Sequence, residues 1–166
     1  MRVVKLGIIS IIVFSILITI ISLFFPSHVR ISKAIDIQTE KDSLLAQLSN
    51  AVNWKNWYPG ADTSELVMIA GKAKGIVTAD KKWLMITSIS DSAIIVSKRI
   101  VPDTRKLLSG WNIFPGHIPN SFTVQWYMDF HLRWYPWEKF SSLLLEKRYG
   151  PMMEQGLERL KALLEK

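Results

Sequence analysis

The chain has 166 residues, carries a net charge of +7 and contains no cysteine. The lack of cysteine excludes disulfides, thiolate zinc sites and a cysteine nucleophile, but it does not select a compartment. Residues 1–33 hold four basic residues and no acidic one, which leaves 17 basic and 14 acidic residues for the remainder. Because the later basic residues are interleaved with acidic ones, nucleic acid is not expected as a partner.

Residues 6–25 form a run without any charged side chain. A helix over this run is about 30 Å long, which matches the hydrocarbon core of a bilayer. Pro26 ends the run, because proline lacks the backbone N–H that a continuing helix needs. The sequence therefore predicts a transmembrane anchor over 1–26, with the lipid bilayer as the partner of residues 6–25, and one folded domain over 27–166.

A cleaved secretory signal and a buried core helix are the alternatives for this segment. A signal would have an apolar core of about 7–15 residues and a small-x-small cleavage site, which is not seen in 24–29. A core helix would show a polar stripe. Basic residues stand on both sides of the run, Arg2 and Lys5 before it and Arg30 and Lys33 after it. The short N-terminal tail favours an inside N-terminus, and hence a single-pass protein with an extracytoplasmic domain.

The folded domain begins with a strand and a short helix. Residues 29–37 alternate between apolar and polar side chains, which predicts a half-buried strand. Thr39 and Asp42 are typical of a helix N-cap. The helix is then expected to bury one face, formed by Leu44, Leu45, Leu48 and Val52. An aromatic turn over 54–60 follows it.

Short apolar runs separated by turn residues continue to residue 132, which is typical of an antiparallel meander. Strands are expected at 66–70, 75–78, 83–89, 93–101 and 107–114. The clearest strand comes last, with one entirely large and apolar face made by Phe122, Val124, Trp126, Met128, Phe130 and Leu132. Such a face requires a partner layer.

A C-terminal helix is expected to supply that layer. It begins at Pro136, and Gly150-Pro151 is expected to interrupt or kink it. Apolar residues recur at helical spacing on both sides of this point, at Phe140, Leu143 and Leu144 and then at Met153, Leu157, Leu160 and Leu164. Leu157 and Leu160 should be buried against the sheet. A long amphipathic helix on one face of a curved antiparallel sheet gives an α+β fold.

The order of these elements, the turn NWKNWYP over 53–59 and the segment YGPMMEQGLERL over 149–160 resemble the START-like (SRPBCC) helix-grip superfamily. The polyketide cyclase/dehydrase-like branch, with its N-terminally anchored bacterial members, is the most similar. The resemblance covers nearly the whole chain and implies a sheet that grips the C-terminal helix around a hydrophobic ligand cavity. Because this superfamily includes lipid carriers, ligand-binding allergens and aromatase/cyclases, the fold does not fix the activity.

No catalytic constellation stands out in the sequence. His28, His117 and His131 lie far apart and share no metal-ligand spacing, so no catalytic residue, metal or cofactor is expected. Asp129 and His131 lie two residues apart on the polar face of one strand, and we expect a solvated pair there rather than a catalytic dyad.

Seven tryptophans are the remaining signal, and strand parity alone does not separate core filling from cavity lining. The expected ligand-binding residues are Trp54, Trp57, Trp83, Trp111, Trp126, Met128, Phe130, Phe140, Leu144 and Met153. We therefore expect a membrane-anchored domain that binds a hydrophobic or amphipathic, lipid-like small molecule. The alternatives are a cyclase/dehydrase-like enzyme on an aromatic or polyketide-like substrate, and a structural or interaction domain with a filled cavity.

Overall fold

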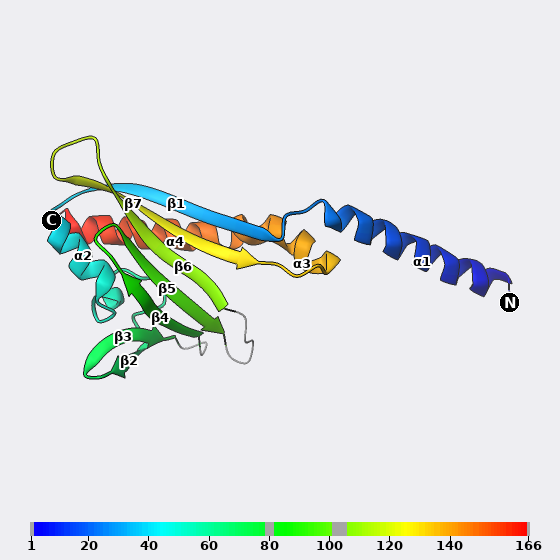
Figure 1. Cartoon of the computed structure of the whole chain (residues 1–166), viewed down its shortest axis with the longest axis horizontal. Coiled ribbons are helices and arrows are strands. Elements are labelled where there is room, and N and C mark those ends of the chain that lie inside the picture. The colour runs from blue at the N-terminus through cyan, green and yellow to red at the C-terminus, as the bar shows by residue number, and fades with distance from the viewer. Residues whose placement is uncertain (1, 79–81, 101–105, 166) are drawn as a thin grey trace.

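The computed structural model describes residues 2–78, 82–100 and 106–165. The first helix, α1 (Arg2–Leu23), extends away from a domain in which an antiparallel sheet packs against a long C-terminal helix, α4 (Leu145–Leu164) (Figure 1). This arrangement confirms the predicted α+β fold.

The sheet has seven strands in the order β1-β7-β6-β5-β4-β3-β2, so β2 to β7 form a meander and β1 lies beside the last strand. The strands are β1 (His28–Gln38), β2 (Glu65–Ile69), β3 (Lys72–Val77), β4 (Lys82–Ile89), β5 (Ala93–Ile100), β6 (Lys106–Pro115) and β7 (Ser121–His131). All the expected strands are present. β3 begins earlier than predicted, because Ala70 and Gly71 both have positive φ and form a tight hairpin turn. The last residue of the strand predicted at 93–101, residue 101, lies outside the described residues.

α1 is a continuous apolar helix of 22 residues, about 33 Å long. The hydroxyls of Ser15, Thr19 and Ser22 donate to backbone carbonyls within the helix at 2.7–2.8 Å. These three hydroxyls are therefore satisfied within the helix and do not oppose an apolar surrounding. Helix α1 is long and apolar enough to span a membrane.

The short helix α2 (Lys41–Ser49) corrects two sequence expectations. Its N-cap is Glu40, which makes no side-chain capping bond, so the predicted cap at Thr39 is wrong. The backbone N–H of Thr39 instead donates to the Asn120 carbonyl at 2.9 Å, which keeps Thr39 in line with β1. Val52 is exposed, because α2 ends at Ser49 and the chain then turns into the 3-10 helix η1 (Asn53–Asn56).

The C-terminal segment consists of α3 (Pro136–Ser141), the 3-10 turn η2 (Ser142–Leu144) and α4. An interruption or a kink was predicted at Gly150-Pro151; the interruption is wrong, because α4 runs unbroken through Pro151. Pro151 removes one hydrogen bond, to the carbonyl of Lys147, and both residues are exposed, so water can reach that carbonyl. Leu157 and Leu160 are buried in the hydrophobic core, as predicted.

Candidate functional site

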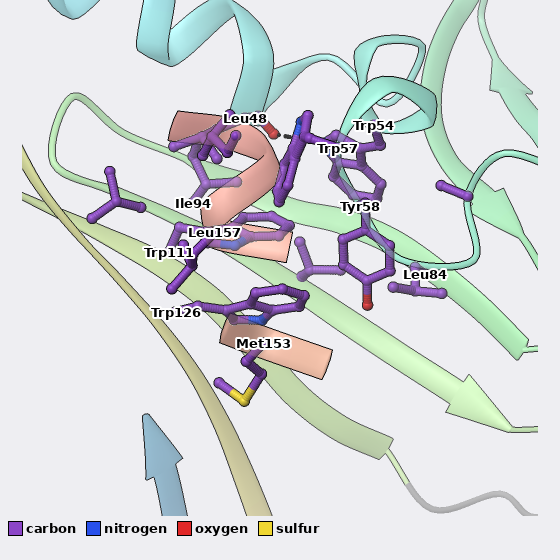
Figure 2. Packing of buried hydrophobic residues seen from close by; sticks show 14 of the residues in the cluster. Leu48, Trp54, Trp57, Tyr58, Leu84, Ile94, Trp111, Trp126, Met153 and Leu157 are labelled. Atoms are coloured by element: carbon purple, nitrogen blue, oxygen red, sulfur yellow. Dashed lines mark hydrogen bonds between the residues drawn. The ribbon is translucent and has the colours of Figure 1, made fainter. Parts of the chain in front are cut away.

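Five aromatic side chains meet between the sheet and α4, and we call them the aromatic cluster: Trp54, Trp57, Tyr58, Trp111 and Trp126 (Figure 2). The first three come from the turn around η1, whereas Trp111 and Trp126 lie opposite each other on β6 and β7. Neighbouring ring centroids are 5.1–6.3 Å apart, mostly in edge-on or tilted contacts. All five residues are buried, and their rings pack directly against one another.

The indole N–H groups of the cluster differ in their partners. Trp54 Nε1 donates to the Leu48 carbonyl at 2.9 Å, and Trp126 Nε1 donates to Ser109 Oγ at 3.0 Å. Trp57 Nε1 has a longer bond of 3.4 Å to the Gln47 carbonyl. Trp111 Nε1 is buried and has no hydrogen-bond partner among the described residues. The cluster therefore contains one unsatisfied donor at its centre.

Helix α4 closes the cluster from the other side. Met153 and Leu157 are buried there, and Met128 is buried on the same face of β7 as Trp126. Gly156 allows the close approach, since a Cβ at this position would lie 2.7 Å from a ring carbon of Trp126 and 2.9 Å from Cδ of Pro59. The fit between helix and sheet thus depends on a missing side chain.

Tyr58 is the only ionisable member of the aromatic cluster. Burial raises the pKa of its hydroxyl above the ordinary value, so the group is protonated at neutral pH. The other buried ionisable side chains among the described residues, Tyr127, Asp129 and Lys139, lie outside the cluster. The site can therefore offer apolar contact and the hydrogen bonds of indole N–H groups and one protonated phenol.

The structure brings together six of the ten predicted ligand-binding residues: Trp54, Trp57, Trp111, Trp126, Met128 and Met153. Tyr58 was missed, although its position inside the aromatic turn was an available signal.

The other four predicted residues lie elsewhere. Phe130 packs on Tyr149 of α4, and Phe140 packs on Phe25 beyond the end of α1, with ring centroids 5.2 Å apart in both pairs. Trp83 on β4 is 40% exposed and Leu144 in η2 is 63% exposed. The sequence could not separate these four residues from the six. The period of a strand or helix predicts the face on which a side chain lies, but not which neighbours it meets on that face.

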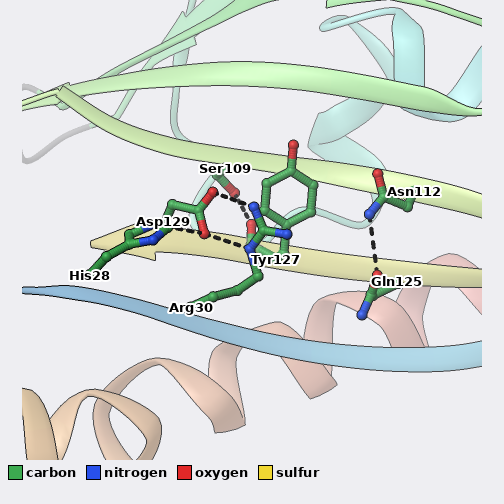
Figure 3. Close-up of polar contacts among 7 residues, drawn as sticks. All are labelled: His28, Arg30, Ser109, Asn112, Gln125, Tyr127 and Asp129. Atoms are coloured by element: carbon green, nitrogen blue, oxygen red, sulfur yellow. Dashed lines mark hydrogen bonds and ion pairs between the residues drawn. The ribbon is translucent and has the colours of Figure 1, made fainter. Parts of the chain in front are cut away.

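Polar side chains form a second group on the opposite face of the sheet, where β1 and β7 pair (Figure 3). Arg30 donates two hydrogen bonds to the Asp129 carboxylate, at 2.6 and 2.7 Å, and its guanidinium lies 4.6 Å from the centre of the Tyr127 ring. These hydrogen bonds hold the pKa of the Asp129 carboxyl below its ordinary value. His28 lies 3.6 Å from the same carboxylate and stacks on His131.

The predicted solvated pair of Asp129 and His131 is wrong, because Asp129 is buried and bonded to Arg30. The sheet register decides this, since it sets His28 opposite His131 and Arg30 opposite Asp129 on strands that are about a hundred residues apart in the chain. Within the described residues, no group of three or more His, Asp or Glu side chains is placed to hold a metal ion. The two Arg30–Asp129 hydrogen bonds join the side chains of β1 and β7.

A curved antiparallel sheet around a long C-terminal helix, with an apolar cluster between them, defines the START-like helix-grip class. The chain belongs to the family described as polyketide cyclase/dehydrase and lipid transport, whose model matches residues 28–165. None of the curated proteins matches the chain.

Solved structures share this fold at low sequence identity. A START superfamily protein from Mycobacterium smegmatis has a TM-score of 0.63 at 14% identity, over 82% of this chain and 97% of that one. A protein from Thermobifida fusca has a TM-score of 0.61 at 11% identity, over 80% and 90% of the two chains. The di-domain ARO/CYC StfQ from the steffimycin biosynthetic pathway has a TM-score of 0.58 at 14% identity, over 83% of this chain and 51% of that protein. At such identities, the likeness establishes the fold alone.

Proposed function

We propose that this protein is a membrane-tethered domain that binds an apolar or amphipathic, lipid-like molecule between the sheet and α4. The observation that carries the proposal is the Nε1 of Trp111, which is buried at the centre of an apolar cluster and has no hydrogen-bond partner in the described part of the chain. A buried donor without an acceptor costs about 1–3 kcal/mol, and native proteins rarely keep one without a reason. An oxygen of a bound molecule would satisfy this N–H, while the surrounding rings would contact its apolar part.

Entry of a ligand requires side chains to move, because Trp111 is buried and packs against the other four rings of the cluster. Met128 and Met153 border the cluster, and methionine adapts its shape at low cost because its side chain is unbranched and flexible. We expect displacement of these two side chains to disturb the contacts between the aromatic rings least.

An enzyme of the cyclase/dehydrase type is the second candidate, and the buried Tyr58 hydroxyl is the observation that favours it. Such an enzyme needs positioned acid and base groups in its cavity. Since Tyr58 is the only ionisable residue of the cluster, we rank binding above catalysis. A structural domain with a filled core is the third candidate, supported by the close ring packing.

Trp111→Phe tests the binding proposal, because it keeps an aromatic ring, although a smaller one, and removes the N–H. Residues 27–166 are titrated with a fluorescent fatty acid and with diphenylhexatriene, which has no oxygen. We expect saturable binding of both, and a loss of about 3- to 10-fold in affinity for the fatty acid alone in Trp111→Phe, the equivalent of one hydrogen bond. Trp83→Phe, on the exposed β4 position, is the matched control and should bind like the parent domain.

Two outcomes would contradict the binding proposal. If the domain binds neither probe and native mass spectrometry finds no co-purified lipid, the carrier proposal fails and the structural one replaces it. Turnover of an aromatic polyketide that depends on Tyr58 would favour the enzyme.

We also propose that α1 is an uncleaved anchor with its N-terminus inside and the domain outside the cytoplasm. The proposal is supported by the apolar length of α1 and by the short basic tail that precedes it. Alkaline phosphatase fused to the C-terminus should be active in intact bacterial cells, because this enzyme matures only after export. A fusion that is stably expressed but inactive would reverse the orientation.

A further inference from the structure

The junction between α1 and the domain is held by a buried lysine. Lys139 of α3 is only 3% exposed, and its ammonium donates to the Phe25 carbonyl at 3.1 Å and to Ser27 Oγ at 2.6 Å. Phe140 packs edge-on against Phe25, and the backbone N–H of Leu132 donates to the Ser27 carbonyl at 2.7 Å. These contacts fix α3 beside the C-terminal end of α1, as Figure 1 shows.

Large apolar side chains are exposed at this same end of the domain. Their exposed fractions are 86% for Phe24, 63% for Trp134, 66% for Trp137, 64% for Leu143 and 63% for Leu144. Tyr135 lies between the two tryptophans, with ring centroids 4.8 and 4.7 Å away. Folded domains rarely expose so many large apolar groups together unless the surface meets a membrane or a partner.

Basic side chains complete this surface. Lys147 and Arg148, both exposed, line an open hollow of about 440 Å³ with Ser141, Leu144 and Leu145. An apolar floor beside two cations suits a phospholipid, whose acyl chain meets the leucines and whose anionic headgroup meets the cations. Tryptophan is also enriched where a protein meets the headgroup region.

We propose that this docking face, formed by Phe24, Trp134, Trp137, Leu143, Leu144, Lys147 and Arg148, rests on the anionic surface of the bilayer that α1 enters. The inference rests on the proposed membrane location of α1 but not on ligand binding. Continuity with α1 selects the bilayer over a second copy of the chain: α1 ends at Leu23, so Phe24 and the adjoining α3 lie at headgroup depth. The domain then sits on the membrane with the α3 end of the sheet lowest.

The chain has no native cysteine, so single cysteines can carry an environment-sensitive fluorophore in the full-length protein. The three sites are Phe14→Cys within α1, Leu144→Cys on the docking face and Ile118→Cys as the control. Ile118 is matched to Leu144, with both 63% exposed, and it lies beyond the far end of β7. The length of β7 puts that end of the strand about 35 Å from its other end, which pairs with the start of β1 beside α1.

The labelled proteins are reconstituted into vesicles of phosphatidylcholine and phosphatidylglycerol that contain a shallow or a deep nitroxide lipid. The Phe14 label should be quenched by the deep nitroxide. The Leu144 label should be quenched by the shallow one at least about twofold more than the Ile118 label, since an interfacial side chain sits at the headgroup–acyl boundary. Adding Lys147→Glu and Arg148→Glu should reduce this quenching, as should replacing phosphatidylglycerol by phosphatidylcholine.

The labels separate the possible failures. A Phe14 label that escapes both nitroxides overturns the membrane location of α1. A quenched Phe14 label with equal responses at Leu144 and Ile118 overturns the docking face alone. If the Leu144 signal instead depends on protein density and not on nitroxide, a second copy covers the face and the bilayer assignment is wrong.

Discussion

Replacing Trp126 with alanine should lower the free energy of unfolding by about 3–5 kcal/mol, as truncation of a large core aromatic typically does. Trp126 is fully buried, contacts Trp57, Tyr58 and Trp111, and donates a hydrogen bond to Ser109. The substitution removes these contacts and leaves a cavity under Gly156. Denaturant unfolding of residues 27–166, followed by circular dichroism, measures the loss.

Trp83→Ala is the matched control for this prediction. Trp83 is 40% exposed, so its truncation should cost about 1 kcal/mol or less. Comparing the two substitutions also tests whether the aromatic cluster is a filled core or lines a cavity. If Trp126→Ala cost no more than Trp83→Ala, the rings would not be packed as described, and an open cavity beside Trp126 would be favoured.

Leu160→Ala should destabilise the domain by about 2–5 kcal/mol, a large share of the 5–15 kcal/mol that holds a typical domain folded. Leu160 is fully buried within the hydrophobic core on the sheet-facing side of α4. The truncation removes apolar contact that attaches the helix to the sheet. Thermal and denaturant unfolding should both shift to milder conditions.

Glu158→Ala serves as the control on the same helix. Glu158 is exposed, so its replacement should change stability by about 0.5 kcal/mol or less. Equal small effects of the two substitutions would mean that α4 is not docked on the sheet. A large effect of Glu158→Ala would mean that the exposed face of α4 has a partner in the native protein.

The two faces of β7 show why part of the site could be predicted from the sequence and part could not. The alternation in β7 placed Trp126 and Met128 on one face and Tyr127 and Asp129 on the other, which is what the structure has. The burial of Asp129 could not be predicted from this alternation, because its partner Arg30 lies on β1 and becomes a neighbour only when the first and last strands pair.

The aromatic residues illustrate the same limit. Trp54 and Trp57 were recognisable as a turn, but their meeting with Trp111 depends on how that turn folds over the sheet. The break in the C-terminal helix was misplaced for a related reason. Proline has a fixed local cost, yet α4 tolerates Pro151 on its exposed side. The α-helical segment is instead interrupted by the 3-10 turn at Ser142–Leu144, before α4 packs on the sheet.

Local patterns of side chains were enough to predict the apolar helix α1, the succession of strands and the amphipathic C-terminal helix. These patterns thereby also predicted the fold class. Tertiary contacts establish which aromatic rings form the cluster, that Trp111 Nε1 finds no partner among the residues described, and that Arg30 reaches Asp129. They also establish that Trp134, Trp137 and Leu144 are exposed beside the end of α1. These features depend on register and on contacts between distant segments, which no local pattern specifies.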